Sequence, residues 1–431
     1  MNSPVLTADR SLQPQNFAER AIWYTIVLSY PLYFLGLVFP VNTTLPWLML
    51  INVGLRFWQQ TPWTPRHERI QIPPLVWVWT IAALTVLLAM YVGLMDFGYD
   101  TREIIRSTLN WMREWALFPI CLTIGSCLNI RPQLIYRAVC NLCAQSIVML
   151  ILCIGAYFAK LPDLIYDSPI ERLTQNGKMF YEIRWYLIDV DSGSLRFSLF
   201  TPWAPALGLV ACIYFLLTLQ ESNKFWKTIG IVGSTAMLLA SVSRGAFIFL
   251  PLSILLIWLW VSANRAYLQL VVGFLVFWLG LFGFTAMQAF EGAVEGFKGA
   301  RKSSSALRER LQTVAFDRWL EAPMWGHGKQ IQGPAVLKKM PLGSHHTWFG
   351  LLFSHGLVGF IAILIASGTT VLCLTIQAKQ NPLARVGLGI MLLLLLTSLG
   401  ENMEKLAYLI WPALVLVGMT LRRSLHYDGA R

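Results

Sequence analysis

The chain has 431 residues, of which 56% are hydrophobic and only 13% are charged, and it contains 18 tryptophans. These apolar side chains exceed what a soluble core can bury, so the composition excludes a soluble globular protein and indicates a polytopic membrane protein. The net charge is +12, but a nucleic-acid partner is not expected because no soluble basic domain is present to hold one.

The long apolar stretches predict helices that span a membrane. Runs of about 17 to 25 apolar residues can cross a bilayer as helices, and these runs are continuous and not alternating, which excludes barrel strands. We therefore expect an all-α fold: one integral membrane domain over residues 1–431, with about twelve transmembrane helices and a large periplasmic loop that carries short helices. The expected spans lie near residues 22–39, 43–58, 73–95, 109–127, 135–159, 197–219, 225–242, 245–262, 266–290, 347–376, 383–400 and 404–421.

Loop charge gives the sidedness of these spans. With both termini cytoplasmic, Lys and Arg concentrate in the tails and inside loops, while the short outside loops hold only Arg102, Arg106, Arg244 and Lys405. This bias follows the positive-inside rule, and the excess charge would contact anionic membrane lipids. The second span is short and contains Pro46, and only Ser243-Arg244 separates the seventh span from the eighth. A merger of either pair would invert the sidedness of all that follows.

Two long segments are expected on the outer side. The first runs over residues 160–196, is mixed in charge and ends at Arg196, where the sixth span begins. The second runs over residues 291–346 and is basic. Within it, Ser303-Ser-Ser305 predicts the start of a helix that continues to about Glu321. Its apolar face would lie on the membrane surface. Long loops in a compact protein are usually functional.

Several cationic and imidazole side chains then fall at one membrane face. Arg196 and Arg244 lie at outer span ends, Arg308 and Arg310 in the second long segment, and His345 and His346 directly before the span at 347–376. Guanidinium groups bind phosphate oxygens in pairs and keep their charge. Histidine is the side chain best suited to accept a proton from a sugar hydroxyl near neutral pH.

Other readings of the same residues stay open. A single Arg at a span end is often an interface anchor, His327 lies between two glycines and would shape a turn, and His355 in mid-span would be a packing residue. A zinc site at His327, His345 and His346 lacks a thiol ligand, and Asp189-Val-Asp191 is only a weak D-x-D metal motif. Neither reading is preferred, so no metal and no cofactor are expected.

The ordered motifs resemble those of a known family. Ser243-Arg-Gly-Ala246, Arg308-Glu-Arg-Leu311, Ala322-Pro-Met-Trp-Gly-His-Gly328 and Ser344-His-His-Thr-Trp348 followed by Gly356-Leu-Val-Gly359 together resemble the O-antigen ligase and polymerase superfamily. The general layout extends over the whole chain, but the specific motifs lie between residues 243 and 359. The chain has His-His where the family commonly has His-Asn.

The resemblance implies a glycosyltransferase of the bacterial inner membrane with a periplasmic active site. It implies transfer of a glycan from undecaprenyl pyrophosphate to another glycan or to lipid A core, and partners in a polysaccharide assembly and export complex. It assigns Arg244 and either Arg310 or Arg308 to the pyrophosphate, Arg196 loosely, and His345 to the catalytic position. The departure from His-Asn makes His346 a second candidate base. Whether the enzyme is a ligase or a polymerase stays open.

Two other classes of function compete with this one. A small-anion transporter, for example of bicarbonate, would also use arginines and many spans, but transporters often show inverted repeats and a site at mid-membrane. A scaffold in an export complex would explain the spans but not the cluster of arginines and histidines. The sequence therefore favours the enzyme.

Overall fold

The computed structural model describes residues 12–64, 69–174, 177–189, 193–266, 302–334 and 340–427, with separate positions between 269 and 292. The side chains of residues 173–174, 302–308 and 423–427 lie outside this description, as do Asp191 and much of the expected span at 266–290.

The described chain is mostly helical. Its helices are α1 (Phe17–Val27), α2 (Ser29–Phe34), α3 (Val38–Trp58), α4 (Pro74–Asp96), α5 (Thr101–Arg113), α6 (Leu117–Cys127), α7 (Pro132–Phe158), α8 (Glu171–Thr174), η2 (Lys178–Phe180), α9 (Ala204–Thr218), α10 (Lys224–Ser241), α11 (Arg244–Ser262), α13 (Lys302–Trp319), α14 (Thr347–Ala378), α15 (Pro382–Thr397) and α16 (Met403–Tyr427).

Six helices of the described chain are long and apolar enough to cross a membrane, namely α3, α4, α7, α11, α14 and α16. Helices α9 and α15 are apolar but shorter. The structure thus supports a multi-pass membrane protein, with fewer clear spans among its described residues than the twelve that the sequence predicts. Helices α10 and α11 are separate, as expected, because Val242 between them takes the left-handed φ of 48°.

Two predicted spans are divided in the structure. The span expected at 22–39 is broken into α1 and α2, and the chain turns at Gly36 before α3 begins. The span expected at 109–127 consists of the C-terminal part of α5 and the short α6. Its interruption follows from the charged pair Arg113-Glu114, which ends the polar helix α5 before the apolar run of α6 begins.

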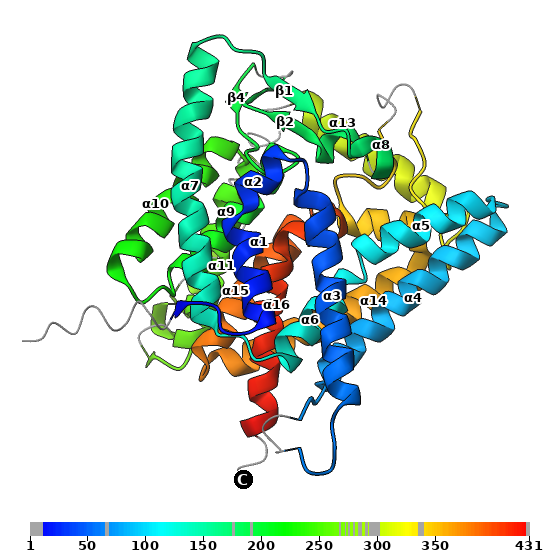
Figure 1. Ribbon diagram of the computed structural model, residues 1–431. Coiled ribbons are helices and arrows are strands. Elements are labelled where there is room, and N and C mark those ends of the chain that lie inside the picture. The colour runs from blue at the N-terminus through cyan, green and yellow to red at the C-terminus, as the bar shows by residue number, and fades with distance from the viewer. Residues whose placement is uncertain are drawn as a thin grey trace, which may run out of the picture.

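Helix α16 runs through the middle of the molecule and is the most buried of the six long helices (Figure 1). Helix α6 packs closely against it at two glycines. A Cβ atom added to Gly125 would lie 1.9 Å from the carbonyl oxygen of Val415, and one added to Gly418 would lie 2.4 Å from that of Leu122. Small residues at such crossings let helix backbones approach closely within a membrane.

The strands gather at one end of the molecule. In the segment 160–196, β1 (Leu164–Asp167) pairs antiparallel with β2 (Glu182–Arg184), and β3 (Leu187–Ile188) with β4 (Leu195–Arg196). Figure 1 shows these strands and α13 at the top, whereas the chain between α3 and α4 and the C-terminal end of α16 lie at the bottom. We call the end that holds the strands, α13 and the start of α14 the upper end.

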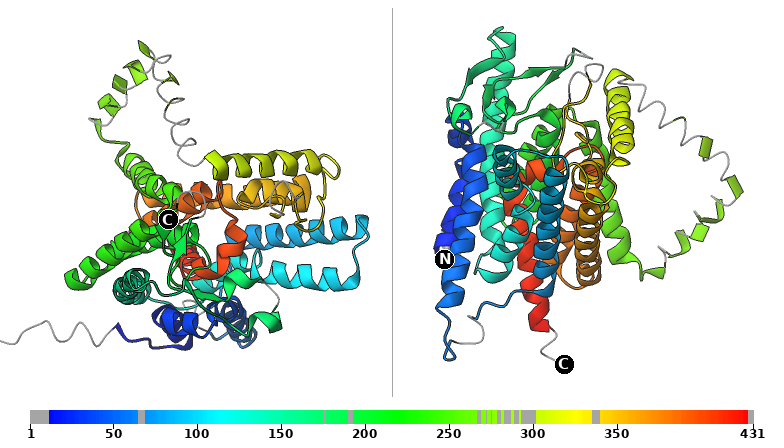
Figure 2. Two further views of the ribbon diagram at one scale, coloured as in Figure 1. Left: turned by 90° about the horizontal axis from the view of Figure 1, so that it is seen from above. Right: turned by 90° about the vertical axis from the view of Figure 1, so that its right-hand side faces the viewer.

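Helices α4, α5, α13 and α14 lie together on one side of the molecule (Figure 2). Leu311 and Ala315 of α13 are buried against Leu342 and Phe353. The helix expected over 303–321 therefore exists as α13, but its apolar face does not lie on the membrane surface. It packs on α14, because the same Leu and Ala positions find a protein partner there.

Candidate functional site

Helix α14 is broken near its upper end at Gly356, which has φ 60° and ψ −166°. A break within a span leaves backbone groups without helical partners, and these must be paired inside the protein. The segment 323–328 supplies the partners through four backbone N–H to carbonyl hydrogen bonds of 2.9 to 3.2 Å. They run from His327 to Phe353, from Gly328 to Ser354, from Leu357 to Pro323 and from Val358 to Met324.

Glycines allow the segment 323–328 to fit between α4 and α14. Gly326 and Gly328 have φ of 71° and 75°. A Cβ atom on Gly326 would lie 2.6 Å from the backbone nitrogen of Gly356, and one on Gly93 of α4 would lie 2.5 Å from that of Gly328. This explains why the motif at 322–328 and Gly356 occur together in the sequence.

His327 lies inside this turn and is buried. Its ring stacks between Phe97 and Phe353, with centroid distances of 4.5 Å to each. Its Nδ1 lies 3.3 Å from the carbonyl oxygen of Phe353 and its Nε2 lies 3.5 Å from Glu321. The position fits the turn-shaping role that the sequence suggests.

His345, two residues before the start of α14, has an unusual backbone conformation. Its φ is 61°, in the left-handed region that residues other than glycine rarely occupy. Its backbone N–H donates to Oδ1 of Asn402 at 2.6 Å, and Nδ2 of Asn402 donates to Oε1 of Glu404 at 2.7 Å. Strained backbone of this kind persists only where surrounding contacts hold it, and it concentrates at functional sites. Asn402 supplies one such contact here.

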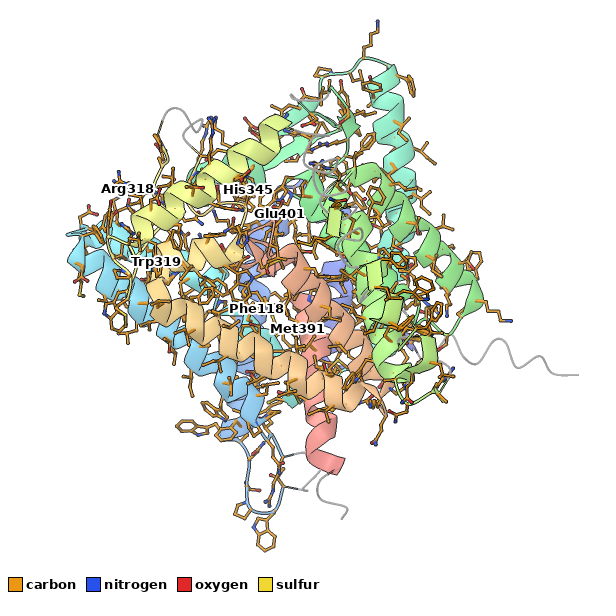
Figure 3. All side chains as sticks on the ribbon, turned by 180° about the vertical axis from the view of Figure 1, so that it is seen from behind. Phe118, Arg318, Trp319, His345, Met391 and Glu401 are labelled. Atoms are coloured by element: carbon orange, nitrogen blue, oxygen red, sulfur yellow. The ribbon has the colours of Figure 1, made fainter. Side chains whose placement is uncertain are left out.

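The turn between α15 and α16 is fastened to the start of α14. The Thr347 N–H donates to the carbonyl oxygen of Ser398 at 3.0 Å, and the Thr347 hydroxyl donates to that of Glu401 at 2.8 Å. Trp348 Nε1 donates to the Ser398 hydroxyl at 2.8 Å. Figure 3 shows the labelled His345 and Glu401 at this end of the molecule. The histidine pair is thus positioned by residues 398–404 as well as by its own helix.

His346 is the N-cap of α14. Its Nδ1 accepts the backbone N–H of Phe349 at 3.4 Å, and its ring packs edge to face on that of Phe349. Because Nδ1 accepts this hydrogen bond, the neutral ring carries its proton on Nε2. Burial lowers the pKa of His346 to about 4, since it disfavours the charged form.

Arg244 and Arg196 lie near each other in the fold, at the same end. Arg244 begins α11 directly after Ser243, and Ser243 packs on Gly208 of α9, where a Cβ atom would lie 2.7 Å from that of Ser243. The Phe197 N–H, next to Arg196, donates to Ala240 at the end of α10 at 3.1 Å. Arg196 pairs with Asp189 at 2.8 Å, and its Nε is buried without a hydrogen-bond partner among the described residues.

Helix α13 carries the remaining predicted arginines. Arg310 is exposed, beside the buried Leu311, while the side chain of Arg308 lies outside the described residues. At the C-terminal end of the helix, Arg318 pairs with Glu321 at 3.0 Å (Figure 3). The structure therefore places Arg310 on a different surface element from Arg196 and Arg244, although α13 also belongs to the upper end.

Three polar residues of the site come from a turn that sequence reasoning treated only as a charged outside loop. Glu401, Asn402 and Glu404 are all buried. Glu401 accepts from Trp203 Nε1 at 3.1 Å, which connects the turn to the start of α9. The sequence does contain a signal for these residues, because two acids and one amide fall within four residues between two apolar helices.

The fold defines a multi-pass helical membrane protein, and its upper end holds the histidine pair before α14 and the arginines Arg196 and Arg244. Residues 229–364 match the model of the family described as O-antigen ligase. This range contains Arg244, Arg308, Arg310 and both histidines, and the match confirms the resemblance of the chain to the O-antigen ligase and polymerase superfamily. No curated protein shows significant similarity to the chain.

Proposed function

We propose that the protein is a bacterial inner-membrane glycosyltransferase that moves a glycan from undecaprenyl pyrophosphate to a sugar hydroxyl at the periplasmic face. The family match supports a ligase or polymerase of surface polysaccharide. The observation that carries the proposal is the strained and clamped backbone of His345 at the same end as Arg244. Both lie within the matched range.

The reaction is an inverting displacement. A histidine removes the proton of the acceptor hydroxyl, and the resulting oxygen forms a bond to the anomeric carbon of the donor sugar. The bond from that carbon to the pyrophosphate oxygen breaks, and the pyrophosphate leaves with the electron pair. Arg244, assisted by Arg310 or Arg308, stabilises the charge on this leaving group through paired hydrogen bonds. The proposal includes neither a metal nor a nucleotide sugar.

Arg196 has a supporting role in this scheme. Its guanidinium already pairs with Asp189, so part of its charge is compensated before any pyrophosphate arrives. The unpartnered Nε leaves one donor available. Arg196 would therefore contribute less than Arg244 to the charge that develops on the leaving group.

The geometry supports His345 as the base in preference to His346. The Nδ1 of His346 accepts the N–H of Phe349, so its other nitrogen holds the proton and has no lone pair for the acceptor hydroxyl. His346 would have to give up its capping bond to act as a base. His345 occupies the position that the family resemblance assigns to catalysis.

Deletion of the gene in its host tests the proposal, with electrophoresis of the surface glycans as the readout. Loss of all polymer linked to lipid A identifies a ligase, whereas glycans with a single repeat identify a polymerase. An unchanged glycan pattern would contradict the proposal, and impaired uptake of bicarbonate in the same strain would then favour the transporter.

A further inference from the structure

A cavity of about 540 Å³ lies between α5, the upper part of α14, the start of α16 and residues 328–332. Its volume falls in the range of about 300–1,000 Å³ that small-molecule sites occupy. Arg196, Arg244 and Arg310, which the proposed mechanism assigns to the pyrophosphate, do not line it. The mechanism proposed above therefore assigns no role to this cavity.

Buried polar groups without partners line this cavity. Ser354 Oγ, His355 Nδ1 and Glu404 Oε2 are buried atoms with no hydrogen-bond partner among the described residues. Ser354 is 3% exposed and Glu404 is 6% exposed. Because buried polar groups in proteins nearly always have a partner, three such groups around one cavity indicate a polar ligand.

The lining of the cavity carries both acidic and basic side chains. It contains the acids Glu103, Glu114 and Glu404 and the bases Arg106, Lys329 and Lys405. Lys329 is paired with Glu103 at 2.8 Å, and Lys405 donates to Gln330 at 2.7 Å. The lining therefore mixes carboxyl, amide, hydroxyl and cationic groups, which suits a ligand with many hydrogen-bonding groups of both kinds.

Two indole rings complete the lining, those of Trp111 and Trp115. Trp111 is fixed by a hydrogen bond from its Nε1 to the carbonyl oxygen of Ala83 at 2.9 Å. A sugar ring presents hydroxyl groups at its edge and C–H groups on its faces. Carboxylates can accept from the hydroxyls, and indole rings offer a rigid apolar surface for the faces.

The cavity is connected to the histidine pair. Gly350, whose N–H donates to the carbonyl oxygen of His346 at 2.9 Å, is part of its lining. Glu404 connects the two sites, because its Oε1 accepts a hydrogen bond from the Asn402 amide that holds His345, and the residue is part of the cavity lining. A ligand in the cavity would lie one helical turn beyond the proposed base.

We propose that this cavity is a saccharide subsite that holds a sugar unit of one of the two glycan substrates while the neighbouring unit reacts at His345. The inference rests on the proposed function for the identity of the reaction. It adds the residues that recognise the glycan: Glu404, Ser354 and Glu114 for hydroxyl groups, and Trp111 for a ring face.

Binding is tested on the full-length chain in detergent micelles, without donor. The probe is the fluorescently labelled oligosaccharide repeat released from the surface polysaccharide of the host. Asn110→Trp places a large ring in the cavity, whereas Leu109→Trp adds the same ring at the adjacent position of α5, which is 42% exposed and outside the lining. We expect the Kd to rise at least about tenfold in the first variant, as for a loss of about 1.4 kcal/mol, and to stay unchanged in the second.

A second pair of variants tests the polar groups without filling the cavity. Glu114→Gln does not alter the Asn402 clamp and should also weaken binding, whereas Glu309→Gln on the exposed surface of α13 should not. Transfer assays then separate the two sources of the saccharide. A raised KM for the acceptor assigns the subsite to the acceptor glycan, and a raised KM for the donor assigns it to the lipid-linked glycan.

The outcomes separate this inference from the proposed function. If the unmodified chain does not bind the oligosaccharide, or if Asn110→Trp and Glu114→Gln bind it as well as their controls do, the cavity is not a saccharide subsite. If binding behaves as expected but no transfer occurs with any lipid-linked donor, the proposed reaction is wrong while the subsite stands.

Discussion

At the scale of single residues, the two adjacent histidines differ in what their neighbours require of them. His345 is held through its backbone, by the amide of Asn402, so its side chain is not needed for that contact. The ring of His346 caps α14, which is a structural role that other N-cap residues can fill. We therefore expect position 346 to tolerate substitution by another N-cap residue and position 345 not to tolerate loss of its imidazole.

The first prediction is that His346→Asn retains glycan transfer while His345→Ala loses it. Asn is among the best N-cap residues, and the substitution restores the His-Asn pair common in the family. Since the pKa of His346 is lowered to about 4, its ring is neutral at and above about pH 5. The acid limb of a pH–rate profile above that pH should therefore be identical in His346→Asn and the unmodified protein. A limb that moves in this variant would identify His346 as the base.

The second prediction concerns Arg244. Lys keeps the positive charge but lacks the planar fork that binds two phosphate oxygens. Arg244→Lys should therefore reduce kcat about 100- to 1,000-fold, the usual effect of removing one preorganised donor. Arg265→Lys, just beyond the other end of α11, is the matched control and should be fully active. Equal activity of both variants would refute a paired contact from Arg244 to the pyrophosphate.

At the scale of elements, the broken helix α14 and the segment 323–328 form one unit. The break at Gly356 exposes backbone groups, and the segment pairs with them. Neither part is stable alone within a membrane, because unpaired backbone groups are costly there. The unit also sets the position of His355 and Ser354 at the cavity.

The third prediction is that Gly356→Ala destabilises the protein and reduces transfer. A Cβ atom at Gly356 would lie 2.3 Å from the carbonyl oxygen of Met324, at a φ of 60° that L residues rarely adopt. Gly368→Ala is the control in the same helix, since a Cβ atom there meets nothing within 4 Å and Ala favours a helix by about 1 kcal/mol over Gly. Thermal unfolding in detergent should show a lower Tm for the first variant only. Equal Tm values would contradict the account of the break.

The elements that the sequence predicted correctly are those with a strong local signal. The apolar runs predicted α4, α7, α14 and the boundary at Ser243-Arg244. A helix was also expected where α13 lies, although the capping role of Ser303-Ser-Ser305 stays a prediction. The break at Gly356 was not predicted, because it depends on backbone partners from residues 323–328 that are distant in the chain. The same holds for Asn402, whose importance comes from its contact with His345 and not from any local pattern.

At the scale of the whole molecule, the structure has two unlike ends. The strands, α13 and His345 occupy one end, and the chain between α3 and α4 and the end of α16 occupy the other (Figures 1 and 3). By the positive-inside rule, the arrangement of charges along the chain predicts that the second end faces the cytoplasm. The proposed periplasmic face is thus the upper end, and labelling can test this assignment.

The last prediction is that a cysteine at Thr313 reacts with a membrane-impermeant thiol reagent on spheroplasts, while one at Gln59 reacts only after the membrane is opened. Both positions are exposed: Thr313 is on α13, and Gln59 follows α3 at the other end. The seven native cysteines are buried or partly buried, so the unmodified protein gives the background. Labelling of the cysteine at position 59 but not of the one at position 313 would show the opposite orientation, with the histidine pair on the cytoplasmic side. Such a result would remove the periplasmic donor from the mechanism, because the site would then face the compartment in which nucleotide sugars are made.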